Sequence, residues 1–134
     1  LAVGIFIDFY AASKAEKQHM AALIEAVLSV SNALLEQNCR HFIVWYDLEG
    51  RHLCKQRISK IEDIYEVTGY LMSAACYDEN MDLKVMYKEA FPYGLYAADI
   101  TLRLSGDILT SDEPVGYFDE KDMETSMGKC MLRV

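Results

Sequence analysis

The sequence lacks the features that mark membrane-spanning proteins, nucleotide-binding loops and cysteine-based redox or zinc sites. No run of apolar residues reaches the ~18 that a membrane-spanning helix needs. The seven glycines are dispersed, which excludes a glycine-rich phosphate-binding loop. The four cysteines, at positions 39, 54, 76 and 130, stand too far apart for a CxxC redox motif or for paired zinc knuckles. The three histidines also lack ligand spacing, so we expect them on the surface.

Basic residues are scarce as well. Thirteen Lys and Arg stand against twenty-one Asp and Glu, which gives a formal net charge of −8. An acidic surface repels phosphate groups. We therefore expect no nucleic-acid partner and no contact of this domain with an anionic membrane.

The residues that are present describe an ordinary globular chain. Its 134 residues are 52% hydrophobic and 25% charged, which predicts one domain over residues 1–134. A chain of this size buries roughly 68–70% of its unfolded surface, so no cofactor or disulfide is expected for folding. It begins without Met in an apolar run with no basic flank, so we expect a piece of a longer protein without a signal peptide. We expect the thiols to be reduced, which indicates a cytoplasmic location, either for a free protein or for the soluble domain of a membrane-anchored one.

Hydrophobic patterning predicts alternating strands and helices in the first half of the chain. The apolar runs at residues 2–8 and 41–46 are typical of strands buried on both faces, and each ends at an acid. Capping boxes at Ser13/Glu16 and Ser59/Glu62 predict helices that extend to Asn38 and to residue 75. Residues 51–58 are expected to form a third strand. Its cationic face either protects a sheet edge or faces an anion.

The second half is predicted to be rich in strands. Residues 83–87, 98–104 and 108–118 have strand patterns, with a tight turn at Gly106 and Asp107. A short helix over 119–129 and a last strand over 130–134 complete the chain. This order predicts an α/β fold: a Rossmann-like, largely parallel central sheet flanked by helices, with a β-rich C-terminal extension. The carboxyl edge of that sheet would hold residues 8–13 and 47–50, where two acids could bind a hard cation.

Three segments, IFIDFYAAS, EAVLSVSNALLEQN and HFIVWYD, together with RISKIEDIYEVTGYLMSA after them, resemble a von Willebrand factor A-like domain. The resemblance is to the uncharacterised bacterial branch often encoded beside MoxR-type AAA+ ATPases, and it spans roughly residues 2 to 76. The family's metal site needs D-x-S-x-S after the first strand. This chain keeps Asp8 but has Tyr10 and Ala12 at the two hydroxyl positions, with Ser13 one position late.

The resemblance therefore implies a non-catalytic protein-interaction domain with a degenerate metal-ion-dependent adhesion motif. Asp8 and Ser13 are its remaining metal candidates, and an adaptor or client of an AAA+ ATPase is the implied role. By the same resemblance, partners meet the carboxyl edge of the sheet, which assigns partner contacts to Phe9, Tyr10, Asp47 and Arg51. The rival expectation is that both aromatic rings fold inward. The sequence favours no oligomeric state.

An alternative of a different class is a metal-dependent nuclease of the PIN/NYN type. Those folds also open with an apolar strand that ends in Asp, and they gather several acids around Mg²⁺ or Mn²⁺. Asp8, Asp47 and Asp99 are the candidates here. Residues 9–12 lack the polar residue that usually follows the first Asp, and the charge of −8 disfavours a nucleic-acid substrate.

Overall fold

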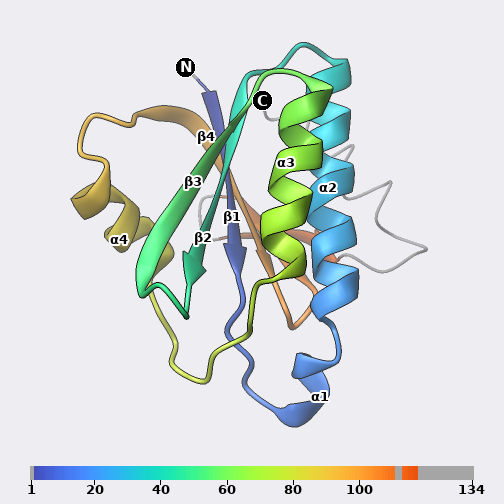
Figure 1. The fold of residues 1–134 in the computed structure, drawn as a ribbon, viewed down its shortest axis with the longest axis vertical. Coiled ribbons are helices and arrows are strands. Elements are labelled where there is room, and N and C mark those ends of the chain that lie inside the picture. The colour runs from blue at the N-terminus through green and yellow to red at the C-terminus, as the bar shows by residue number, and fades with distance from the viewer. Residues whose placement is uncertain (1, 111–112, 118–134) are drawn as a thin grey trace.

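A computed structural model describes residues 2–110 and 113–117 (Figure 1). The described strands are β1 (Ala2–Asp8), β2 (His41–Asp47), β3 (His52–Ile58), β4 (Tyr96–Arg103), β5 (Asp107–Thr110) and β6 (Glu113–Tyr117). The described helices are α1 (Lys14–Lys17), α2 (Met20–Glu36), α3 (Ile61–Met72) and α4 (Leu83–Ala90). The helix and strand expected over 119–129 and 130–134 lie outside the described residues. Within the described residues, no helix is long and apolar enough to cross a membrane.

The described strands form one mixed sheet in the order β3-β2-β1-β4-β5-β6. Only β1 pairs in parallel, with β2 on one side and β4 on the other, whereas the pairs β2–β3, β4–β5 and β5–β6 are antiparallel. The prediction of a Rossmann-like, largely parallel sheet is therefore wrong. The physical reason is the length of the connections: residues 48–51 and 104–106 are too short to cross over the sheet, so they can join only antiparallel neighbours. The expected β-rich extension is part of the same sheet.

The sheet buries both faces. On β1, Ile5 and Ile7 point into the larger core with α2 and α3, while Phe6 points into a smaller core with Tyr87 of α4. α2 and α3 lie side by side on one face and α4 lies on the other (Figure 1). The unbroken apolar run of β1 thus follows from burial on two faces, as predicted.

The helices depart from the sequence prediction in three places. The helix expected from Ser13 is interrupted at residues 18–19, so the Ser13 cap heads only the short α1. Residues 83–87, expected as a strand, begin α4, because Asp82 caps it and the apolar Leu83 and Tyr87 stand one helical turn apart. The cap of α3 is shifted by one position: the carboxylate of Asp63, not Glu62, accepts hydrogen bonds from the backbone N–H groups ahead of the helix.

Other sequence-based expectations agree with the structure. Asn38 has a φ of 56° just past α2, which is the left-handed conformation expected of a helix stop. Gly106 has a φ of 98° in the turn between β4 and β5. β3 is an edge strand of the sheet, which agrees with the first of the two interpretations of its cationic face.

Candidate functional site

Asp8 ends the central strand β1 and lies between β2 and β4, at the carboxyl edge of the sheet. Its side chain is buried, with 6% of the residue exposed. The carboxylate Oδ1 accepts hydrogen bonds from the backbone N–H of Tyr10 at 3.1 Å and from the hydroxyl of Tyr77 at 3.4 Å. Its Oδ2 lies 3.7 Å from Nε of Arg103. Both carboxylate oxygens are therefore engaged by the protein itself.

Tyr77 brings a distant segment of the chain to this site. A parallel bridge joins Tyr10 and Tyr77, with the N–H of Ala11 donating to the Tyr77 carbonyl and the N–H of Tyr77 donating to the Phe9 carbonyl. Burial raises the pKa of the Tyr77 hydroxyl, and the neighbouring Asp8 carboxylate raises it further. Tyr77 therefore keeps its proton and acts as a hydrogen-bond donor to Asp8 at neutral pH.

The same environment shifts the pKa of the Asp8 carboxyl group. Burial raises this pKa above its usual value of 3.8 because the charged form loses its hydration. The Tyr10 N–H, the Arg103 guanidinium and the Tyr77 hydroxyl each oppose that rise. Asp8 consequently ties three chain segments together at an energetic cost that those partners only partly offset.

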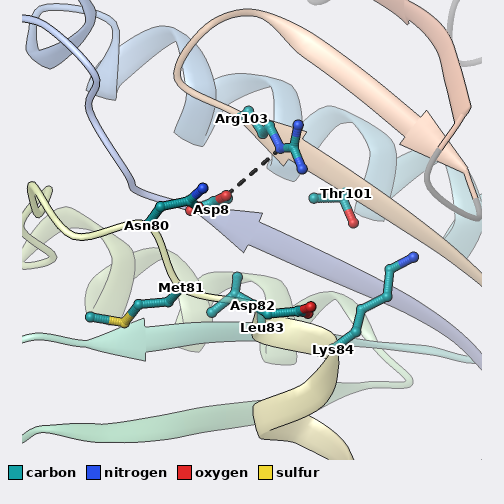
Figure 2. Close-up of a pocket in the computed structure, with 8 residues that line it drawn as sticks. All are labelled: Asp8, Asn80, Met81, Asp82, Leu83, Lys84, Thr101 and Arg103. Atoms are coloured by element: carbon teal, nitrogen blue, oxygen red, sulfur yellow. Dashed lines mark ion pairs between the residues drawn. The ribbon is translucent and has the colours of Figure 1, made fainter.

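A polar cavity of about 290 Å³ opens beside Asp8, between the carboxyl end of the sheet and the start of α4 (Figure 2). It is lined by Asp8, Asn80, Met81, Asp82, Leu83, Lys84, Thr101 and Arg103. The charged groups are used within the chain: Lys84 Nζ lies 3.0 Å from Asp99 Oδ1, and Asp82 accepts a hydrogen bond from the N–H of Val85 at 3.2 Å. Figure 2 shows Arg103 on the same side of the cavity as Asp8, with the ion pair between the two side chains drawn as a dashed line.

The residues expected to form a metal motif do not gather around Asp8. Ser13 accepts a hydrogen bond from the N–H of Glu16 at 3.3 Å and so acts as a helix cap. Ala12 offers only backbone groups, and its N–H donates to the Glu16 carboxylate at 3.1 Å. The ring of Tyr10 is half-buried. The described residues thus bring no aliphatic hydroxyl from positions 10 or 12 to Asp8.

The residues expected to contact a partner divide into two groups. Phe9 is 0% exposed and packs in the core on the α2 and α3 side, which removes its ring from any surface in this fold. Tyr10 and Asp47 are half-buried, and Arg51 is exposed. Arg51 has a φ of 54° in the turn that joins β2 to β3. The expected edge therefore keeps Tyr10, Asp47 and Arg51 as accessible residues.

The acids of the nuclease alternative do not converge. Asp99 pairs with Gly4 in the β1–β4 register, whereas Asp8 pairs with Arg103, so Asp99 lies roughly 13 Å back along the strands. Asp47 stands two residues after Trp45 and shares its face, the α2 and α3 side, whereas Asp8 points to the α4 side with Phe6. No observation on the described residues favours the nuclease.

The sequence alone does not indicate that Arg103 and Tyr77 hold Asp8. Arg103 is the outward residue of an alternating strand, and its place opposite Asp8 depends on the β1–β4 register. Tyr77 lies in an irregular segment whose pairing with Tyr10 has no local sequence signal. The histidines also differ from expectation at one position, because His41 is buried and lies with Nε2 2.6 Å from the Ser31 hydroxyl.

Comparisons with known proteins do not identify a family for this chain. Neither models of protein families nor curated proteins nor solved structures gave a match to this chain. The functional conclusion therefore rests on the geometry described above and on the resemblance seen in the sequence.

Proposed function

We propose that this chain is a non-catalytic protein-interaction domain of the von Willebrand factor A-like type, in which Asp8 serves as a structural tie instead of a metal ligand. The observation that carries the proposal is the engagement of both Asp8 oxygens by Tyr10, Tyr77 and Arg103. A cation that approached this carboxylate would have to displace the Arg103 guanidinium or share the oxygen that accepts from Tyr10 and Tyr77. Among the described residues, the cavity beside Asp8 is lined by no Ser, Cys or His side chain.

The proposed partner surface is the carboxyl edge of the sheet, formed by Tyr10, the β2–β3 turn and the adjoining end of α3. The turn presents Leu48, which is 40% exposed, and Arg51. Tyr70 of α3 is 51% exposed and stacks on Trp45, with ring centroids 6.4 Å apart. Aromatic and arginine side chains are the groups that most often carry binding energy at protein interfaces.

The partner that we propose is an AAA+ ATPase of the MoxR type, with this domain as its adaptor or client. Only the sequence resemblance supports this identity. The net charge of −8 disfavours nucleic acid. We propose a cytoplasmic location, either for a free protein or for the soluble part of a membrane-anchored one. The free thiols of Cys39, Cys54 and Cys76 suit a reducing compartment.

Interferometry with an immobilised MoxR-type ATPase tests both the partner and the surface. The variants Leu48→Ala and Tyr70→Ala should each weaken binding, and Tyr70→Ala by at least about 10-fold, because a truncated aromatic anchor costs on the order of 2 kcal/mol. The matched control is Tyr93→Ala. Tyr93 is 95% exposed but lies ahead of β4, whose first residue pairs with Ala2 at the opposite end of the sheet.

Two results would count against the proposal. One is equal loss of binding in Tyr93→Ala and Tyr70→Ala, or no binding of the wild-type chain to the ATPase. The other is a metal-dependent phosphodiesterase activity that disappears in Asp8→Asn, since that would make the Asp8 site catalytic. Circular dichroism of each variant ensures that a loss of binding is not a loss of folding.

A further inference from the structure

A second group of side chains gathers on the β2–β3 hairpin, on the face of the sheet opposite to Asp8. Asp47 pairs with His52 across the hairpin, and Trp45 pairs with Cys54. Because side chains alternate along a strand, Asp47, His52 and Cys54 all project from the same face. One ligand atom from each residue lies within 4.8 Å of the other two. The hairpin thus brings a carboxylate, an imidazole and a thiol to one point.

The spacing of the imidazole nitrogen and the thiol sulfur matches tetrahedral zinc coordination. The distance from His52 Nε2 to Cys54 Sγ is 3.5 Å. Zinc–sulfur and zinc–nitrogen bonds of about 2.3 and 2.05 Å at a tetrahedral angle place the two ligand atoms about 3.6 Å apart. A donor set of sulfur, nitrogen and oxygen also suits Zn²⁺, whereas Mg²⁺ and Ca²⁺ prefer oxygen alone.

Gly50 in the turn leaves the space in which Asp47 and His52 converge. A Cβ atom at Gly50 would lie 2.7 Å from Asp47 Oδ2 and 2.7 Å from His52 Nδ1. Gly50 is not among the residues with a positive φ, so the backbone conformation does not require glycine here. The requirement for glycine is the close approach of the two side chains.

The surroundings favour a cation and leave room for another ligand. The three residues line a cavity of about 530 Å³ together with Glu49 and the C-terminal end of α3 at Tyr70 and Ser73. The C-terminus of a helix carries partial negative charge, which attracts cations. Lys55 of β3 also lines this cavity, but its ammonium group reaches the opposite face, where Nζ donates to the Tyr87 hydroxyl at 2.8 Å.

We propose that Asp47, His52 and Cys54 form a binding site for Zn²⁺ or a similar thiophilic divalent ion, with three protein ligands and an open fourth position that faces the cavity. This goes beyond the proposed function and departs from the sequence-based expectation of no cofactor. A bound ion would hold the two ends of the β2–β3 turn together. It would thereby fix the shape of the turn that presents Leu48 and Arg51.

Titration of the full chain with Zn²⁺ after chelator and reductant treatment tests the site. We expect one ion per chain, with saturable heat at micromolar zinc. Co²⁺ in place of Zn²⁺ should give visible d–d bands of tetrahedral type and a thiolate-to-cobalt charge-transfer band. Cys54→Ser should abolish that band and weaken zinc binding by at least about 10-fold, since even an outer partner of a metal ligand is worth that much.

The matched control is Cys39→Ser, which removes another half-buried thiol just before β2, at the opposite end of that strand from Asp47, and should keep the cobalt spectrum. Gly50→Ala removes no ligand, yet its methyl group would push Asp47 and His52 apart, so it should weaken zinc binding while thermal stability in chelator stays unchanged. No saturable zinc binding, or a cobalt spectrum that persists in Cys54→Ser, would overturn the proposal. Neither result involves the ATPase, so this test is independent of the proposed function.

Discussion

Asp8→Ala should destabilise the domain by about 2 kcal/mol, because it removes one acceptor from two donors. The Tyr77 hydroxyl is buried and would lose the acceptor of its proton, which costs roughly 1–3 kcal/mol. The Tyr10 N–H is only half-buried and water can partly replace its acceptor, so we assign about 0.5–1 kcal/mol to that loss. The ion pair with Arg103 adds little, because the arginine side chain is 46% exposed.

Asp8→Asn separates the hydrogen-bonding role of Asp8 from its charge. The amide oxygen of asparagine can still accept from Tyr10 and Tyr77, so this variant should be at least as stable as the wild type at pH 7. The sign follows from the raised pKa of Asp8: the folded protein binds this proton more tightly than the unfolded chain. The stabilisation from protonated Asp8 is complete below pH 3.8 and is lost as the pH rises through the folded pKa.

Urea denaturation followed by circular dichroism measures both effects. At pH 7 the order of stability should be Asp8→Asn equal to or above wild type, with Asp8→Ala lowest. The advantage of Asp8→Asn over the wild type should shrink as the pH falls toward 3. If Asp8→Ala is as stable as the wild type at pH 7, the carboxylate is not a structural tie.

Two further predictions concern a helix cap and a buried histidine. Ser59→Ala should lower the free energy of unfolding by only about 0.5 kcal/mol, because the Ser59 hydroxyl makes one exposed hydrogen bond to Asp63. Asp63→Ala should lower it more, since this change also removes the acceptor for two backbone N–H groups. Chemical denaturation should give this order of stability, and the reverse order would contradict the prediction. His41 has its pKa lowered by burial, so the folded protein resists its protonation and stability should fall as the pH drops below 6.5. In thermal melts between pH 7 and 5, His41→Gln should weaken this pH dependence, and an unchanged slope would assign it to other groups.

The parts of the fold that follow from local patterns were predicted well. Continuous apolar runs identified β1 and β2, and the stop at Asn38 followed from its tolerance of a positive φ. The direction of the strands was predicted wrongly, although the short connection over residues 48–51 already implies an antiparallel hairpin. α4 was mistaken for a strand because its eight residues offer only two buried positions, Leu83 and Tyr87.

The candidate sites depended on contacts between distant residues. Asp8 was identified because it ends an apolar run, but Arg103 reaches it only through the β1–β4 register. The hairpin cluster was more accessible from the sequence. Once residues 48–51 are taken as a hairpin loop, Asp47 lies opposite His52, and Cys54 follows on the same face. The histidine and cysteine were instead judged by spacing along the chain, which does not show cross-strand neighbours.

The central claim, that Asp8 is a structural tie in a degenerate metal motif, is tested most directly by calorimetric titration with Mg²⁺ and Mn²⁺. The titrated protein should carry Asp47→Ala together with Cys54→Ala, so that the hairpin cluster keeps only one of its three ligands. We expect no saturable heat at millimolar ion, because both Asp8 oxygens interact with groups of the chain and positions 10 and 12 carry Tyr and Ala. A one-site isotherm that disappears when Asp8→Ala is added would contradict the claim.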